Sequence, residues 1–119
     1  MINWKKLISS FNHAFSGLRV AFKEEQSFRI QLFIALVVFV FMFLFPLYFF
    51  ERVVLVLIIA FVLGLELINS QVERVANLVK TDHDPRIKQI KDLSAGAVLV
   101  ASVSAVVIAI FIFFSHLVK

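Results

Sequence analysis

The sequence contains no cysteine, only three glycines and two prolines, and few charged residues. Without cysteine, the chain cannot form disulfides, hold metals through thiolates or use a cysteine nucleophile. Gly17, Gly64 and Gly96 are too scattered to build a glycine-rich phosphate-binding loop, which argues against a Walker-type nucleotide site. Charged residues make up 17% of the chain, against roughly 25% in an average soluble domain.

Apolar side chains dominate the composition. Hydrophobic residues account for 61% of the 119 residues, fifteen residues are Phe, and the mean hydropathy is +0.98. A soluble domain of this length cannot bury so much apolar surface, and disordered chains have low hydrophobicity. Both classes are therefore excluded, and the length predicts a single domain, residues 1–119.

Three apolar stretches predict three transmembrane helices and an all-α membrane protein. The first stretch carries no charge and, at about 1.5 Å per residue, reaches roughly 31 Å, enough to cross a hydrocarbon core. Glu51 and Arg52 predict a very short turn after it, and Glu66 interrupts the second stretch. The predicted elements are a surface helix within residues 1–29, transmembrane helices at 30–50, 53–72 and 93–117, and a cytoplasmic segment at 73–92.

The N-terminal segment predicts an amphipathic helix that lies in the membrane interface. Its apolar residues recur at helical spacing, and its basic and polar residues lie largely off that stripe. A helix packed on other protein is the alternative. Because polar residues recur throughout this segment, we do not expect a signal peptide. The apolar stripe consists of Trp4, Leu7, Ile8, Phe11, Ala14, Phe15, Leu18 and Phe22.

The basic residues predict the orientation. By the positive-inside rule, the N-terminus and the segment between the second and third spans lie in the cytoplasm, and the C-terminus lies outside. We therefore expect a multi-pass membrane protein whose net charge of +4 matches anionic lipid, with no nucleic-acid partner. The basic residues that decide this are Lys5, Lys6, Arg19, Lys23 and Arg29, and then Arg74, Lys80, Arg86, Lys88 and Lys91.

Glu66 is the first residue that suggests chemistry. A charged side chain at the centre of a membrane helix costs roughly 2.5–3.5 kcal/mol on insertion scales, so it normally faces protein or water and is functional. Asn69, Glu73 and Asn77 follow at helical spacing and share one face with Glu66. Glu73 alone is typical of a solvated helix end, but the whole stripe predicts a functional face on a helix that continues into the cytoplasm.

Two carboxylates with an amide between them suit a divalent cation. Mg²⁺ is usually held by one or two carboxylates together with substrate phosphates and water. One helix supplies too few ligands, and Glu24 and Glu25 are candidate partners on the same side of the membrane. The alternative is that both are solvated residues at the end of the surface helix.

The segment before the third span is basic and suits a polyphosphate, because lysine binds phosphate oxygens as a point charge. Asp82, His83 and Asp84 could bind a metal, although this pattern before a proline is more often a turn with Asx hydrogen bonds. Asp92 could instead cap the third helix, and Lys91 could be a membrane-surface anchor.

Small residues recur every four positions along the third predicted span, an arrangement that lets helix backbones approach closely. Three spans and one surface helix are too few to enclose a polar site, so we expect an oligomer. His116, near the outer end, is given no role. The small residues are Ala97, Ala101, Ala105 and Ala109.

Several segments resemble the prokaryotic diacylglycerol kinases and undecaprenol kinases, which are small integral-membrane lipid kinases. The resemblance covers residues 4–115. Its most specific part is the glutamate–asparagine–glutamate stripe followed by Lys91-Asp92. The matching segments are Ala-Phe-Ser-Gly-Leu-Arg at 14–19, Glu25 with Phe-Arg-Ile at 28–30, Glu-Leu-Ile-Asn-Ser-Gln-Val-Glu at 66–73, Ile-Lys-Gln-Ile-Lys-Asp at 87–92 and Ala-Gly-Ala-Val-Leu at 95–99.

The resemblance implies an enzyme that transfers the γ-phosphoryl group of Mg-ATP to a membrane lipid alcohol. It also implies a location in the bacterial inner membrane, a cytoplasmic active site and a homotrimer with sites at the subunit boundaries. Glu66 matches the family's proposed general base, which deprotonates the lipid hydroxyl, and Asn69 matches the polar residue beside it. Glu25 and Glu73 match its carboxylates that bind metal and nucleotide, and Arg19 is implied in substrate binding.

The remaining implied contacts are to the nucleotide. They are Lys91 and Asp92, and with weaker matches Lys6, His13, Asp82, His83 and Asp84. The sequence departs from the family's pattern at Gln71, where a small residue is usual, and at Asn77, where an aspartate is frequent. Ile90 likewise replaces a small residue. The central acidic and basic positions are all present, so the resemblance implies an active enzyme.

The sequence leaves two candidates for the acceptor lipid, undecaprenol and diacylglycerol. Residues 95–99 resemble the undecaprenol kinase branch slightly more than the diacylglycerol kinase branch. Two other functions remain as alternatives: a small ion-coupled transporter that uses Glu66 as its ionisable site, and an inactive membrane scaffold. A transporter does not explain Lys91-Asp92 or the basic segment before the third span.

Overall fold

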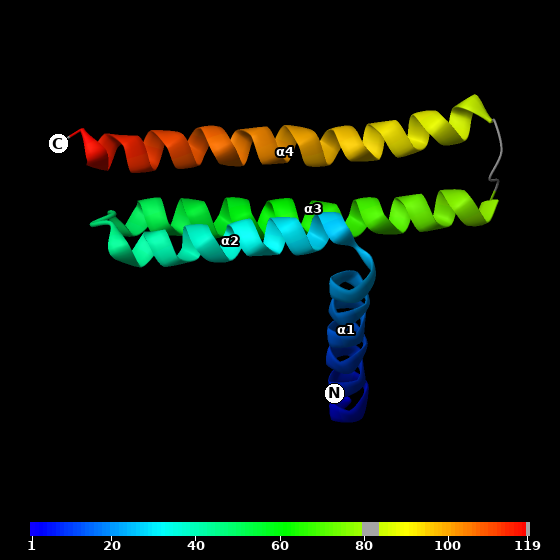
Figure 1. Cartoon of the computed structure of the whole chain (residues 1–119). Coiled ribbons are helices and arrows are strands. Elements are labelled where there is room, and N and C mark those ends of the chain that lie inside the picture. The colour runs from blue at the N-terminus through cyan, green and yellow to red at the C-terminus, as the bar shows by residue number, and fades with distance from the viewer. Residues whose placement is uncertain (80–83, 119) are drawn as a thin grey trace.

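The computed structural model describes residues 1–79 and 84–118, and these fold into helices without any strand. The helices are α1 (Trp4–Glu24), α2 (Gln26–Leu44), α3 (Phe49–Val79) and α4 (Pro85–Leu117). The last three are long and apolar enough to cross a membrane. They lie alongside one another, while α1 leaves the bundle crosswise (Figure 1). The expected all-α membrane protein, with an amphipathic surface helix and three spans, is confirmed.

The helix limits differ from the apolar runs because of local backbone signals. A single extended residue, Glu25, separates α1 from α2, so α2 begins at Gln26 rather than near residue 30. The helix ends at Leu44 because Phe45 precedes Pro46, and the residue before a proline is pushed out of helical conformation. Membrane limits do not follow from helix limits, so the proposed spans at 30–50, 53–72 and 93–117 and the single domain over 1–119 stay predictions.

The sequence predicted the turn between α2 and α3 at Glu51 and Arg52, but this prediction is wrong. The turn lies just before α3, which begins at Phe49. Both residues belong to the first turn of α3 and cap the helix ends around it. Glu51 Oε1 accepts the Tyr48 N–H at 2.8 Å, and Arg52 Nε donates to the Met42 carbonyl at 3.0 Å. These bonds satisfy backbone groups that a helix end leaves without partners.

His116 joins this turn to the end of α4. Its Nε2 lies 2.8 Å from Glu51 Oε1, and the two side chains are only 6% and 11% exposed. The sequence suggested no role for His116, whereas the structure makes it a buried link between α3 and α4. We call this group, consisting of Tyr48, Glu51 and His116, the turn-end cluster.

The core of the bundle lies next to the turn-end cluster. Met42, Leu47 and Leu55 are buried there, and side chains from the second half of α4 pack against them. Phe45 and Phe113 meet edge to face with ring centroids 5.1 Å apart. The small-residue face of α4 contributes Ala101, which is buried, and Ala109, which packs on this core. Ala97 of the same face is exposed, so this face packs within the chain only in part.

At the opposite end, α3 and α4 both extend past the level at which α1 leaves the bundle (Figure 1). The second span therefore continues as a helix to Val79, as the polar stripe predicted. The fourth helix begins at Pro85, with Asp84 as its N-cap, well before the apolar part of the span. This arrangement places polar residues of α3 beside the junction of α1 and α2.

Candidate functional site

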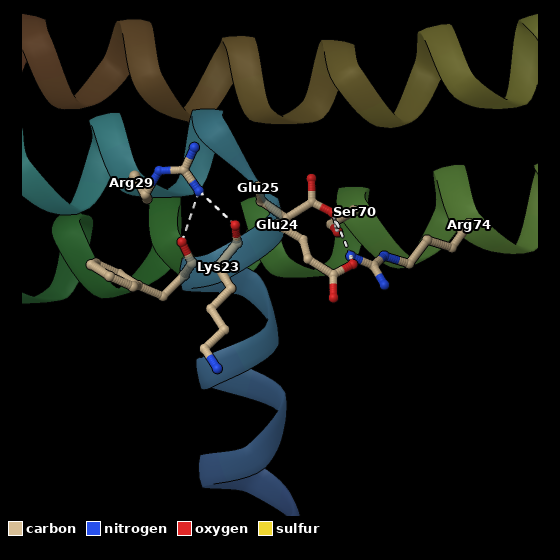
Figure 2. A network of polar contacts seen from close by, with 7 residues as sticks. Lys23, Glu24, Glu25, Arg29, Ser70 and Arg74 are labelled. Atoms are coloured by element: carbon tan, nitrogen blue, oxygen red, sulfur yellow. Dashed lines mark hydrogen bonds and ion pairs between the residues drawn. The ribbon is translucent and has the colours of Figure 1, made fainter.

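Glu25 occupies the junction between the surface helix and the bundle. It is the one residue between α1 and α2, with φ −110° and ψ 105°, so its side chain leaves the helical path and points toward α3 (Figure 2). Its Oε1 accepts the Ser70 hydroxyl at 2.7 Å and the Arg74 guanidinium at 2.8 Å. The same Arg74 nitrogen lies 3.2 Å from Glu24 Oε1. We call Glu24, Glu25, Ser70 and Arg74 the junction network.

The junction network keeps Glu25 ionised. The hydrogen bond from the Arg74 guanidinium, with a further one from Ser70, lowers the pKa of the Glu25 carboxyl below its ordinary value of 4.5. A carboxylate at this place can hold a cation at neutral pH. Both bonds go to Oε1, so neither of them uses Oε2.

The lowered pKa of Glu25 predicts an acid-dependent loss of stability. A depressed folded-state pKa contributes stability above the unfolded value of 4.5, and the contribution is lost as the pH falls through the folded value. Wild type should therefore melt at a higher temperature than Glu25→Gln at about pH 7 and lose this advantage progressively as the pH falls below 4.5 and through the lowered pKa of the folded state. Thermal melts of both proteins in detergent across this range measure it, and a difference that does not change with pH would contradict the ionic link.

Glu66 lies one helical turn before Ser70 and is buried, with 7% of its surface exposed. Gln31 Nε2 of α2 donates to Glu66 Oε2 at 3.3 Å. The carboxylates of Glu25 and Glu73 are close enough to interact electrostatically with it. The structure thus brings together three of the predicted acidic residues, from two different parts of the chain.

Two side-chain oxygens in this region are buried without a hydrogen-bond partner among the described residues. They are Oε1 of Gln31 and Oδ1 of Asn69. Buried polar groups are normally bonded, so an unmatched acceptor in a protein interior calls for a bound water or a ligand. Asn69 follows Glu66 by three positions on α3, and its Oδ1 is an acceptor available to a donor from outside the described residues.

The far end of the polar stripe connects α3 to α4. Lys91 Nζ donates to Asn77 Oδ1, so Asn77 brings the expected nucleotide-binding lysine to the stripe. Lys88 Nζ lies 2.7 Å from Asp92 Oδ2. The alternative of Asp92 as a helix cap is wrong, because α4 begins seven positions earlier, at Pro85. Glu73 is exposed on the same face of α3.

The remaining predicted residues lie apart from the carboxylates. Lys6, His13 and Arg19 are exposed on α1, where His13 Nε2 lies 3.3 Å from Ser9 Oγ. Asp84 caps α4 and pairs with the Arg86 side chain. The hydrogen bond from that side chain lowers the pKa of the Asp84 carboxyl most, and the hydrogen bond from the Arg86 backbone N–H lowers it further. Within the described parts of the chain, no hydrogen bond or ion pair joins these four residues to Glu25, Glu66 or Glu73. Asp82 and His83 lie outside the described residues.

Sequence reasoning missed three residues that contact the site. Ser70 and Arg74 follow Glu66 at intervals of four, so helical spacing could have placed them on the same face. Gln31 could have been noticed as a polar residue inside an otherwise apolar run. The three carry hydrogen bonds to the two glutamates that the sequence singled out.

The donor set fits a cation that brings most of its own ligands. In residues 1–79 and 84–118, no group of three or more candidate side chains is arranged to enclose a metal ion. Mg²⁺ bound to a nucleotide needs only one or two carboxylates from the protein, since phosphates and waters complete its octahedron. Glu25 and Glu73, both near Glu66, can supply them.

Comparison with known proteins agrees with this arrangement. The family model for prokaryotic diacylglycerol kinase matches residues 12–113. The undecaprenol kinase of Bacillus subtilis (strain 168) is 32% identical over 112 residues, which cover 94% of this chain and 91% of the relative. The diacylglycerol kinase of Haemophilus influenzae is 33% identical over 101 residues, 80% of either chain. The diacylglycerol kinase of Synechocystis is 36% identical over 103 residues, which cover 86% of this chain and 59% of the relative.

The match extends over nearly all of the four helices, including the junction network, the Glu66 region and Lys91-Asp92. The architecture of three apolar helices agrees with a multi-pass membrane protein. The chain therefore belongs to the prokaryotic diacylglycerol kinase family and is a membrane lipid kinase, a phosphotransferase that acts on an alcohol group.

Proposed function

We propose that this lipid kinase transfers the γ-phosphoryl group of ATP, as its Mg²⁺ complex, to the hydroxyl of a membrane lipid alcohol, with undecaprenol preferred over diacylglycerol. The observation that carries the proposal is the burial of Glu66 beside two further carboxylates. Phosphoryl transfer asks a protein mainly for positioning and charge compensation. A buried base next to metal-binding carboxylates is the arrangement this reaction needs.

Glu66 is the proposed general base and Asn69 its neighbour in the site. The lipid hydroxyl gives its proton to the Glu66 carboxylate as its oxygen forms a bond to the γ-phosphorus, and the bond between the γ-phosphorus and ADP breaks. The open Oδ1 of Asn69 can accept a hydrogen bond from a substrate or water. Arg19 is proposed to contact the lipid from the surface helix.

Glu25 and Glu73 are the proposed holders of Mg²⁺, which when bound offsets the negative charge of the nucleotide phosphates. Lys91, kept beside the stripe by Asn77, is proposed to bind phosphate oxygens, with Asp92 next to it. Lys6 and His13 of the surface helix, and the residues Asp82, His83 and Asp84, are proposed as further nucleotide contacts. In the assembled enzyme we expect these residues to meet at the subunit boundaries of a homotrimer.

The proposed orientation puts the N-terminus and this site in the cytoplasm and the C-terminus outside the bacterial inner membrane. The support is the distribution of basic residues, which gather in α1 and around the α3–α4 connection. ATP is available on that side. The preference for undecaprenol is supported by the match to the Bacillus subtilis undecaprenol kinase along nearly the full length of both chains.

The test is ATP consumption by the detergent-purified protein with Mg²⁺ and either undecaprenol, diacylglycerol or no lipid. We expect turnover that depends on lipid and on Mg²⁺ and is faster with undecaprenol. Phosphorylation of diacylglycerol but not undecaprenol would refute the acceptor preference. Absence of turnover with both lipids, in protein shown to be folded, would refute the proposed reaction and make Gln71 and Asn77 the first positions to restore.

A further inference from the structure

We propose that Arg74 and Ser70 are positioning residues for Glu25: they hold its Oε1 so that its Oε2 is presented to the Mg²⁺ of the nucleotide. This inference rests on the metal role of Glu25 in the proposed function. Arg74 and Ser70 touch neither substrate nor metal in this scheme. They act through the carboxylate that they bind.

The geometry is that of two donors converging on one oxygen. Ser70 and Arg74 are one turn apart on α3, and their side chains reach the same Oε1 at 2.7 and 2.8 Å (Figure 2). Ser70 is buried, and the side chain of Glu25 is 25% exposed. A short charge-assisted bond and a buried hydroxyl bond together fix the rotation of the carboxylate, which leaves Oε2 on its other side.

Fixing this carboxylate matters because of its place in the chain. Glu25 follows the last turn of α1 and precedes the first turn of α2, so no helical neighbour on either side determines its rotamer. Ordering a free glutamate side chain costs conformational entropy. Contacts that order it before the cation arrives remove that cost from binding, and hydrogen-bond partners of metal ligands typically change metal affinity 10- to 100-fold.

Arg74 also contacts Glu24, but that contact is the weaker of the two. The distance is 3.2 Å, and the Glu24 side chain is 59% exposed, so water screens the pair. The contact ties the end of α1 to α3 and has a structural consequence only. The effect on cation binding must come through Glu25, which Arg74 approaches to 2.8 Å.

The experiment measures binding of Mn²⁺, a paramagnetic substitute for Mg²⁺, to the full-length protein with a non-hydrolysable ATP analogue, by electron paramagnetic resonance. Arg74→Gln should raise the half-saturating Mn²⁺ concentration about tenfold or more, and Ser70→Ala by a smaller factor. Arg74→Lys, which keeps a cation, should recover part of the loss. In turnover assays, excess Mg²⁺ should restore most of the kcat of Arg74→Gln, which a general folding defect would not allow.

The matched control is Lys23→Gln. Lys23 lies beside the junction network, and its ammonium points away from both glutamates (Figure 2). This variant removes one positive charge from the same region without touching Glu25, so Mn²⁺ binding should not change. If Lys23→Gln weakened Mn²⁺ binding as much as Arg74→Gln, the effect would come from the net charge of this region and not from the contact between Arg74 and Glu25. That result would overturn the inference.

Two further outcomes separate this inference from the proposed function. If Glu25→Gln weakens Mn²⁺ binding but Arg74→Gln binds Mn²⁺ as tightly as wild type or more tightly, Glu25 is a ligand and Arg74 does not position it. If Glu25→Gln itself binds Mn²⁺ like wild type, the metal role of Glu25 fails and the positioning role fails with it. Thermal melts of each variant establish that the protein is folded.

Discussion

Glu66→Gln is expected to reduce kcat by about 10²- to 10⁴-fold, the range that a positioned general base contributes, while leaving binding of the Mg-nucleotide largely intact. Glutamine has nearly the volume of glutamate, and its oxygen can still accept the hydrogen bond from Gln31. It cannot take a proton from the lipid hydroxyl. The measurements are kcat with saturating lipid and equilibrium binding of a non-hydrolysable ATP analogue.

The conservative control for this prediction is Glu66→Asp. It keeps the carboxylate but withdraws it by one methylene group, so some turnover should remain, above that of Glu66→Gln. Full activity in Glu66→Gln would rule out a catalytic proton transfer to this residue. Equal loss of nucleotide binding and turnover would mean that Glu66 serves the nucleotide and not the lipid hydroxyl.

The second large effect is expected on stability, at the opposite end of the bundle. Glu51→Ala removes the acceptor that receives the Tyr48 N–H and faces His116, in a place where the side chains of Glu51 and His116 are almost fully buried. Each buried donor that loses its acceptor typically destabilises a protein by about 1–3 kcal/mol. Unfolding of the detergent-solubilised protein by sodium dodecyl sulfate measures the change in the free energy of unfolding.

Two controls accompany Glu51→Ala. Glu51→Gln keeps an acceptor oxygen without the charge, so its loss should be smaller. Ser115→Ala changes an exposed neighbour of His116 that bonds the Ile112 carbonyl of its own helix, and it should shift stability by no more than about 0.5 kcal/mol. Because the turn-end cluster is distant from Glu66, folded Glu51→Ala should retain kcat. An unchanged unfolding curve would contradict the link between α3 and α4.

The sequence was sufficient for features that depend on local spacing. Apolar runs predicted the three long helices, and the intervals between Glu66, Glu73 and Asn77 predicted their shared face on a helix that extends beyond the apolar run, to Val79. Glu25 was also a candidate partner of this helix, and in the structure it contacts Ser70 and Arg74 of α3. All these inferences use neighbours within a few turns, where helix geometry fixes the answer.

Contacts between residues far apart in sequence could not be predicted. Arg74 and Glu25 are separated by 49 positions, and His116 and Glu51 by 65. Their pairing depends on the direction in which α1 leaves the bundle and on the register of α4 against α3, and neither follows from periodicity. The place of the α2–α3 turn could not be predicted either, because a charged pair between two apolar runs is typical of a turn, whereas Glu51 and Arg52 cap helix ends here.

The connection between the surface helix and the bundle consists of one residue, Glu25. With 21 residues, α1 is roughly 31 Å long at about 1.5 Å per residue, and its whole change of direction falls on the backbone dihedrals of Glu25. A rotation of about 5° about the backbone of Glu25 would displace the N-terminal end of α1 by roughly 3 Å over that length. Arg29 of α2 opposes such a rotation, because its guanidinium donates to the carbonyls of Phe22 and Lys23 in the last turn of α1 (Figure 2). The angle between the surface helix and the bundle is therefore held by the same few residues that orient the Glu25 carboxylate.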